Sequence, residues 1–484
     1  MVKTTISSTK EESGLFCALT CILMMNTPNT RKILRKFFID TKLLYLMVFI
    51  GVNSLFGQRT AINFDYLTVD ERPREPIGFL GTGVSIFHSS LPVYAGIRLN
   101  NAAWGSRAGY YTFGYHAGAI LPLSNSLSLQ PRLMFTSGGG AESNDGSGWF
   151  VSPAVTLNKG FGSYNLGVGA QYSYVSTGVI QGASAYFTIN KDVDFNIPFE
   201  KASTVQLFTN TVWSPTNERS SGIGFIGVGG RNFHAITYES VYLTAAVTDL
   251  GGYMDVYGGK GIWKQVGPLR FLAEGNLGTG GGGRAPAGGG ILYGAGGEIQ
   301  LHHANMFIGS SGGILKSFDG PFYFSFVGIH LGTELSFNSK NSSQSEFDWA
   351  NLCIENSIRT YLGPSGFSNL GVAFQLFKKS WVSLRGESYW AFTDGRGAYA
   401  EGLFGLRIQP GWAYVEGQLG AGAGGGINLW NGAGLAFVNT GVDIPLSNSL
   451  SVNPKLVYNV FSTTPFPRYG IQLGLTCKIP FKMH

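Results

Sequence analysis

Hydrophobic and polar residues alternate almost without a break at the C-terminal end of the chain. From Tyr469 to Phe481 the odd-numbered positions are apolar or aromatic, and the even-numbered positions, which include Gln472 and Lys478, are small, polar or charged. Because successive side chains of a strand point to opposite faces, this segment has one apolar face and one polar face. A run of about ten such residues ending on an aromatic residue is typical of a transmembrane β-strand.

The same alternation recurs along the chain. In residues 164–174, for example, Leu166 and Val168 alternate with Asn165 and Gly167. The last third of the chain contains eight strand-like runs, at residues 353–362, 369–377, 381–391, 397–408, 412–420, 432–446, 449–461 and 469–481. A strand and its connection together take about 17 or 18 residues, which suits antiparallel hairpins and is too short for strand–helix–strand units. The pattern predicts an all-β, antiparallel protein.

Internal repeats divide the chain into units of about 140 residues. Residues 121–135 match residues 444–458 at nine of 15 positions, and residues 271–278 and 328–332 recur 142 positions later, at 413–420 and 470–474. We therefore predict a short N-terminal segment at residues 58–74 and a barrel region at 75–484. This region contains a partial unit at about 75–190 and two further units at about 200–340 and 345–481.

Three architectures fit these repeats. One large transmembrane β-barrel of roughly 16–24 strands is favoured, because closure removes the sheet edges, whose unpaired backbone groups lipid does not tolerate. Separate barrels, one for each repeat, come second. A secreted array of soluble β-sandwiches comes third.

The N-terminal 57 residues have the pattern of a leader. Residues 43–57 form the longest apolar stretch, and they follow a basic stretch that contains Arg31, Lys32, Arg35 and Lys36. This order predicts a cleaved secretory signal ending at Gly57, and a stretch of about 15 residues is short for a membrane-spanning helix. A buried helix or a membrane anchor is the alternative. The signal predicts export.

Composition supports strands that face lipid and argues against a nucleic-acid partner. Glycine is very common, with 71 residues, and charged residues make up only 13%, about half the usual share. The leader contains seven of the 34 basic and three of the 28 acidic residues, which leaves a net charge near +2 for the remainder. A chain so close to neutral lacks the positive field that nucleic-acid binding needs.

With these features in view, the chain resembles bacterial outer-membrane β-barrel proteins over essentially all of residues 58–484. The Phe56-Gly57-Gln58 junction is similar to the leaders of Bacteroidetes-type envelope proteins. The segment from Gly470 to Phe481 resembles the C-terminal signal that the barrel-assembly machinery reads, although three residues follow its aromatic end. The resemblance implies a Gram-negative outer-membrane location, contact with the lipid bilayer and recognition by that machinery.

Polar side chains on the faces opposite the apolar ones are the candidate functional residues. They recur at matching repeat positions and on the last strand: Arg270, Glu274, Asn276, Tyr414, Glu416, Gln418, Gln472 and Lys478. One interpretation is a polar stripe in the lumen that sets ion or solute preference. The other, which is favoured, is a structural polar interior with paired charges, as any such barrel needs.

No pattern predicts a catalytic, metal or cofactor site, and we predict that the chain is not an enzyme. The adjacent His302 and His303 would point to opposite faces of a strand, so they cannot easily chelate one ion. The glycine-rich residues 278–290 lack the Gly-Lys-Ser/Thr ending of a phosphate-binding loop.

The sequence leaves three hypotheses for function. The first is a porin-like channel or transporter for small solutes. The second is a structural or partner-binding barrel of an envelope or secretion assembly. The third is a secreted soluble β-rich adhesin, which the aromatic residues near the strand ends disfavour.

Overall fold

A computed structural model describes residues 59–479 of this chain, apart from short internal segments. The segments outside the description are residues 70–74, 89, 141–148, 176–179, 194–202, 217–218, 249, 251, 284, 305, 338–350, 363–365, 378–381, 392–398, 424–433, 448–449 and 462–467. The leader predicted at residues 1–57 and the C-terminal Phe481 therefore lie outside the described residues. Among the described residues, no helix is long and apolar enough to cross a membrane.

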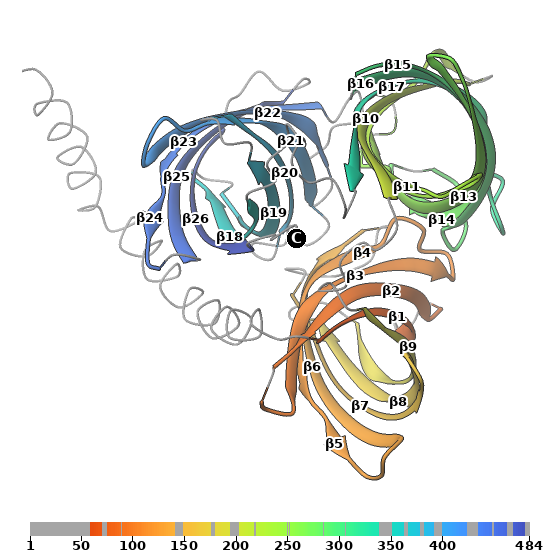
Figure 1. The fold of residues 1–484 in the computed structure, drawn as a ribbon. Helices are drawn as coiled ribbons and strands as arrows, with labels where there is room; N and C mark the ends of the chain where they lie inside the picture. Colours follow the sequence, from red (N-terminus) through yellow and green to blue (C-terminus); the bar gives the residue numbers. More distant parts are fainter. Residues whose placement is uncertain are drawn as a thin grey trace, which may run out of the picture. The chain divides into compact units, whose positions relative to one another are not determined.

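The described strands form three closed antiparallel barrels, each drawn as a separate ring in Figure 1. Barrel 1 consists of β1 (Arg59–Val69), β2 (Ile77–Phe87), β3 (Val93–Trp104), β4 (Tyr111–Ala119), β5 (Leu121–Pro122), β6 (Leu127–Gly139), β7 (Trp149–Phe161), β8 (Tyr164–Val175) and β9 (Gln181–Val193). Barrel 2 consists of β10 (Ser203–Thr216), β11 (Arg219–Phe233), β12 (Thr237–Ala246), β13 (Met254–Val266), β14 (Leu269–Gly281), β15 (Ile291–His303), β16 (Met306–Ser317) and β17 (Tyr323–Phe337). Barrel 3 consists of β18 (Asn351–Tyr361), β19 (Ser368–Phe377), β20 (Val382–Ala391), β21 (Ala400–Ile408), β22 (Ala413–Ala423), β23 (Gly434–Val442), β24 (Ile444–Pro445), β25 (Leu450–Phe461) and β26 (Arg468–Ile479).

Each barrel closes on its own strands. The first strand of each repeat pairs with the last strand of the same repeat, so that β1 pairs with β9, β10 with β17 and β18 with β26. In barrels 1 and 3 the pairs β4–β6 and β23–β25 complete the ring, and the two-residue strands β5 and β24 lie beside it. Every ring therefore contains eight full-length strands.

The all-β antiparallel barrel class is confirmed, but the preference for one large barrel is wrong. The strand total lies at the upper end of the predicted range and is divided among three rings. The prediction of a partial first unit is wrong as well. Strand β1, within the predicted N-terminal segment, pairs with both β2 and β9 and completes an eight-stranded ring. One large ring and three small rings both pair the backbone groups of every edge strand, so alternation alone does not distinguish them.

The repeats fall on equivalent strands in barrels 2 and 3. The matched residues 271–278 and 413–420 lie in β14 and β22, each the fifth strand of its ring, and the later match lies in β17 and β26, each the eighth. The match between residues 121–135 and 444–458 instead joins the fifth full-length strand of barrel 1, β6, with the seventh of barrel 3, β25. Barrel 1 is thus offset from the other repeats by one hairpin.

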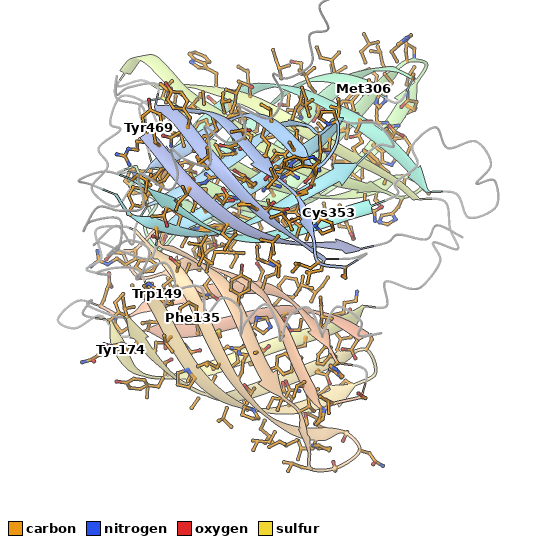
Figure 2. All side chains as sticks on the ribbon, turned by 90° about the vertical axis from the view of Figure 1, so that its left-hand side faces the viewer. Phe135, Trp149, Tyr174, Met306, Cys353 and Tyr469 are labelled. Atoms are coloured by element: carbon orange, nitrogen blue, oxygen red, sulfur yellow. The ribbon has the colours of Figure 1, made fainter. Side chains whose placement is uncertain are left out.

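The barrel walls carry apolar side chains outside and polar side chains inside. On β15, Ile299 and Leu301 are exposed on the outer wall, whereas Glu298 and Gln300 are buried. Figure 2 shows the side chains of Tyr174 and Tyr469 on the outside of the walls, where 45% and 60% of each residue is exposed. Full-length strands of 9 to 15 residues are long enough to cross a bilayer when tilted.

The two rims of each barrel differ in the length of their connections. On one rim, two-residue turns join β7 to β8, β13 to β14 and β15 to β16. The first residue of each turn, Gly162, Gly267 or Ala304, has a positive φ of 52–63°, as such tight hairpins require. Longer connections dominate the other rim, for example residues 282–290 between β14 and β15. Short turns on one side and longer loops on the other are typical of outer-membrane barrels.

Candidate functional site: the barrel interiors

Among the described residues, a network of eight charged side chains lies inside barrel 3. Four basic and four acidic residues are at most 5% exposed, and they are Arg359, Arg385, Arg407, Lys455, Glu355, Glu387, Glu401 and Glu416. They come from β18, β20, β21, β22 and β25, so strands around most of the ring contribute. Formal charges in this set cancel. Because an eight-stranded barrel is only wide enough for its own side chains, this network fills the interior along much of the ring.

The ion pairs of barrel 3 form one continuous network. Arg359 pairs with Glu387, at 2.5 Å, and with Glu401. Arg385 joins Glu387 to Glu355, with N–O distances of 2.9 Å to each. Glu387 therefore faces cations on two strands, and Glu401 shares Arg359 with Glu387. A buried charge is tolerable only with such partners, since isolated burial costs several kcal/mol.

Glu355 and Glu416 extend this network to the remaining cations. The ammonium of Lys455 lies 3.0 Å from Glu355 and 3.5 Å from Glu416, and the guanidinium of Arg407 lies 2.7 Å from Glu416. Aromatic rings cover the guanidinium faces. Arg407 lies 3.6 Å from the ring centroid of Tyr414. The phenol ring therefore replaces water over the face of the cation.

Inward glycines make room for these long side chains. A Cβ added to Gly474 on β26 would lie 2.6 Å from the Glu355 carboxylate. In barrel 1, a Cβ on Gly81 would overlap the guanidinium of Arg98. A glycine in a strand often marks such a close approach. Part of the high glycine content is thus explained by the charged interior.

The described residues of barrel 2 include two arginine–carboxylate ion pairs and line a small cavity. Arg270 pairs with Glu334 at 2.9 Å, and Arg231 pairs with Glu298 at 2.5 Å. A cavity of about 30 Å³ adjoins the second pair and is also lined by Glu274, Asn276 and Tyr242, among others. The carboxylate of Glu274 accepts hydrogen bonds from Tyr242, at 2.6 Å, and from Ser240, at 2.9 Å. The lining thus contains two carboxylates and one guanidinium, together with the imidazole of His330, which lies 2.8 Å from Glu298.

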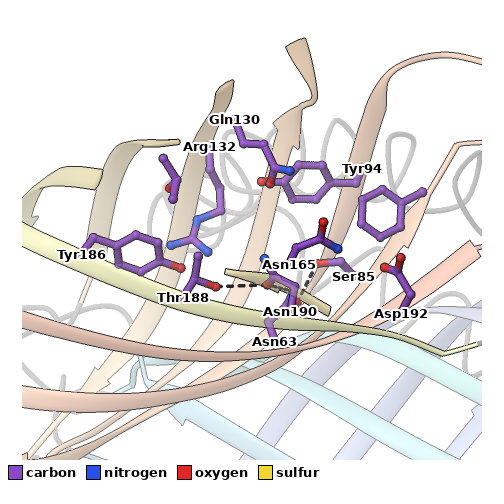
Figure 3. Close-up of a pocket in the computed structure, with 12 residues that line it drawn as sticks. Asn63, Ser85, Tyr94, Gln130, Arg132, Asn165, Tyr186, Thr188, Asn190 and Asp192 are labelled. Atoms are coloured by element: carbon purple, nitrogen blue, oxygen red, sulfur yellow. Dashed lines mark hydrogen bonds between the residues drawn. The ribbon is translucent and has the colours of Figure 1, made fainter. Parts of the chain in front are cut away.

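Barrel 1 contains a second cavity of about 30 Å³, drawn in Figure 3. Side chains from β1, β2, β3, β6, β7, β8 and β9 line it, so it lies inside the ring. Most of the lining is amide, hydroxyl or phenol, and Arg132 and Asp192 are its charged members. A volume of this size holds about two water molecules.

The structure places seven of the eight candidate residues inside the barrels. Arg270 pairs with Glu334, and Glu274 and Asn276 both line the cavity of barrel 2. In barrel 3, Tyr414, Glu416, Gln418 and Gln472 are each at most 3% exposed. The side chain of Lys478 lies outside the described residues. The candidates are divided between two barrels, so they do not form one stripe.

Sequence reasoning missed most of the charged network. Arg359, Arg385, Glu355 and Glu387 all obey the inward alternation of their strands, but repeat matching selected only strands β14, β22 and β26. A search for charged residues at inward positions of every predicted strand would have found them. Which carboxylate meets which cation depends on the closure of the ring.

Comparisons with known proteins show no relationship in sequence. No protein-family model matches the chain, and no curated protein matches it. Among solved structures, the chain is similar to the outer-membrane protein OpdK of Pseudomonas aeruginosa. The identity is 11%, the coverage is 87% of this chain and 98% of that one, and the TM-score is 0.22.

Two further structures from Pseudomonas aeruginosa give similar values. OccK8 (OprE) is 10% identical, with coverage of 88% of this chain and 98% of that one and a TM-score of 0.23. The siderophore receptor PirA is 9% identical, with coverage of 87% and 80% and a TM-score of 0.25.

Proposed function

We propose that the chain is an outer-membrane β-barrel protein of the porin-like transport class, with narrow interiors that bind or pass small solutes. The observation that carries this proposal is the inverted polarity of three closed barrels. Large apolar side chains such as Val168, Leu419 and Ile329 are more than half exposed on the outer walls, whereas charged residues lie inside. A soluble barrel would expose this apolar surface to water at a cost that lipid removes.

The few charges on the described outer walls are consistent with this placement. Glu239, two residues from the start of β12, lies directly opposite Lys260 on β13. Both are exposed on the outer face of barrel 2. Lys260 is the seventh of the 13 residues of β13, and its long side chain can extend along the wall toward the strand end at which Glu239 lies.

The cavities limit what can pass. The polar linings in barrels 1 and 2 enclose about 30 Å³ each, which is enough for water or a simple ion and too little for a sugar. We therefore expect conductance far below that of a 16-stranded porin, whose lumen is an open aqueous channel.

Planar-bilayer recording of the folded full chain tests the transport proposal. We expect small, discrete conductance steps, and liposome-swelling assays should show exclusion of monosaccharides. The variant Glu274→Gln removes one negative charge from the cavity of barrel 2 and should lower cation preference, measured as a shift in reversal potential under a salt gradient. Glu239→Gln makes the same charge change on the outer wall and should leave the reversal potential unchanged. Flat recordings from correctly folded protein would refute transport.

A structural or partner-binding role is the second candidate, and barrel 3 favours it. The eight charged residues of its network are balanced and buried, which favours a rigid ring over an open passage. Crosslinking in intact cells followed by mild-detergent extraction should recover one envelope protein at fixed stoichiometry. Recovery of the chain alone, with clear conductance, would leave the transport role.

The proposal includes export through a cleaved leader and assembly through the C-terminal strand. Strand β26 closes barrel 3 by pairing with β18 and β25, and it belongs to the segment that resembles the assembly signal. Truncation after Ile479 removes the aromatic end and should reduce the amount of heat-modifiable barrel in the outer membrane. Wild-type assembly of the truncated chain would contradict recognition through the C-terminal end.

Cleavage of the leader after Gly57 is tested separately, by N-terminal sequencing of the mature protein.

A further inference from the structure

We propose that the interior of barrel 1 binds one small inorganic anion, of about the size of chloride, at the guanidinium of Arg132. All the described residues that form this site belong to barrel 1. It goes beyond the proposed function because the anion can bind whether or not it crosses the membrane.

The first support is a cluster in which two guanidinium groups share one carboxylate. Arg98 and Arg132 both approach a single carboxylate, that of Asp65, and the side chains of Arg98 and Asp65 are fully buried. Arg98 is the closer partner, and its Nε also donates to Asn100 at 2.7 Å. Arg132 reaches Asp65 only through Nη1, at 3.7 Å. One carboxylate thus serves two guanidinium groups, whereas the eight-residue network of barrel 3 has as many carboxylates as cations.

The second support is a pair of buried donors without partners. The side chain of Arg132 is only 7% exposed, and its Nε and Nη2 atoms make no hydrogen bond within the described residues. Its guanidinium lies 4.4 Å from the ring centroid of Tyr186, which covers one face and leaves the edge with these donors for a ligand. Buried charged donors that lack an acceptor are costly, so an acceptor is expected here.

The third support is the cavity beside this guanidinium. Figure 3 shows the Arg132 side chain extending between Tyr186 and Thr188, with Gln130 and Asn165 also on the lining. Amide and hydroxyl groups of this kind can donate to a bound ion. The space of about 30 Å³ suits a monatomic anion. Water would satisfy the donors, whereas an anion would in addition bring a second negative charge close to the two guanidinium groups that share Asp65.

One acidic residue also lines this cavity. Asp192 is the next-to-last residue of β9, and Figure 3 shows it at the end of the group away from Arg132. Its negative charge opposes anion binding at a distance. It therefore offers a variant that should strengthen the site.

The experiment is a ³⁵Cl NMR linewidth titration of the folded full chain in a non-ionic detergent. Exchange of chloride with a buried protein site broadens the free-chloride signal, and added bromide should remove the broadening by competition. Arg132→Gln should weaken chloride binding by about tenfold or more, the effect of losing charge-assisted hydrogen bonds. Lys159→Gln removes the same charge from the exposed outer wall of the same barrel and should leave binding unchanged.

Asp192→Asn provides a test that does not depend on the stability of the arginine variant. It should tighten chloride binding, and gel mobility before and after boiling shows that each variant is folded. Broadening that is absent from the wild type, or that survives Arg132→Gln, would overturn the proposal and leave water alone in the cavity. Because binding is measured at equilibrium in micelles, a failure of transport in bilayers would not affect the result.

Discussion

Removal of one carboxylate from barrel 3 tests whether the charge network holds this ring together. Glu355→Gln keeps the size of the side chain and removes its charge. The Glu355 carboxylate lies 2.9 Å from Arg385 and 3.0 Å from Lys455, and it accepts a hydrogen bond from Gln472 at 2.9 Å. Within the eight-residue network, the variant leaves four cations and three carboxylates.

The expected loss is large. Two unit charges about 3 Å apart attract by about 5 kcal/mol at an effective dielectric constant of about 20, and Glu355 has two such partners. The amide oxygen of glutamine retains part of this attraction as hydrogen bonds. Removing one partner from a buried ion pair costs about 3–5 kcal/mol, and we expect the free energy of unfolding of barrel 3 to fall by that amount.

Hydrogen exchange measured by mass spectrometry can assign this loss to one barrel. Peptides from β18 and β26 should lose protection, and peptides from barrels 1 and 2 should not. Adding Lys455→Met restores charge balance, so the double variant should recover at least about 1 kcal/mol relative to Glu355→Gln. Glu239→Gln, on an exposed pair, should cost less than about 1 kcal/mol in barrel 2. A loss below 1 kcal/mol for Glu355→Gln, or strict additivity in the double variant, would refute the reasoning.

Three further predictions follow from the same geometry. Gly474→Ala places a Cβ 2.6 Å from Glu355 and should destabilise barrel 3 by about 1–3 kcal/mol, measured by hydrogen exchange. Gly417→Ala is the control and should be nearly neutral, because the space around its Cβ is open. Equal effects of the two variants would count against the close approach of Gly474 to Glu355. Val168→Lys, in the middle of the outer wall of β8, should make the free energy of folding into liposomes less favourable by about 2–4 kcal/mol. Phe161→Lys lies at a strand end and should cost about 1 kcal/mol or less. Equal costs would contradict a bilayer around barrel 1. Tyr242→Phe removes the hydroxyl group that donates to Glu274 and accepts from Arg231. The variant should lower the free energy of protection from hydrogen exchange in β12 by about 1–3 kcal/mol. Unchanged protection would show that these hydrogen bonds contribute little to stability.

The alternation of the sequence predicted the strands with good accuracy. The eight runs expected in the last third of the chain correspond to β18–β23, β25 and β26, and most ends agree within a few residues. Strand alternation has a fixed period of two, so it can be recognised one segment at a time. The same local rule placed Glu416, Gln418 and Gln472 on the polar faces that lie inside barrel 3.

Closure and pairing were decided only by the tertiary structure. The sequence does not show that β9 returns to β1 rather than continuing into β10, because both edges present the same backbone groups. That choice sets three narrow interiors in place of one wide lumen. It also brings Arg359 to Glu387 and Glu401 across the ring, and it leaves Arg98 and Arg132 to share Asp65.

The sequence by itself therefore determined the class of fold, the two faces of each strand and the polarity of each face. These properties depend on neighbouring residues along one strand. Tertiary structure decided the number of barrels, the size of their cavities and the balance of charge inside each one. These properties depend on side chains that are distant in sequence and meet only when a particular ring closes. The interior of an eight-stranded barrel is so narrow that one arginine on one wall can reach the opposite wall.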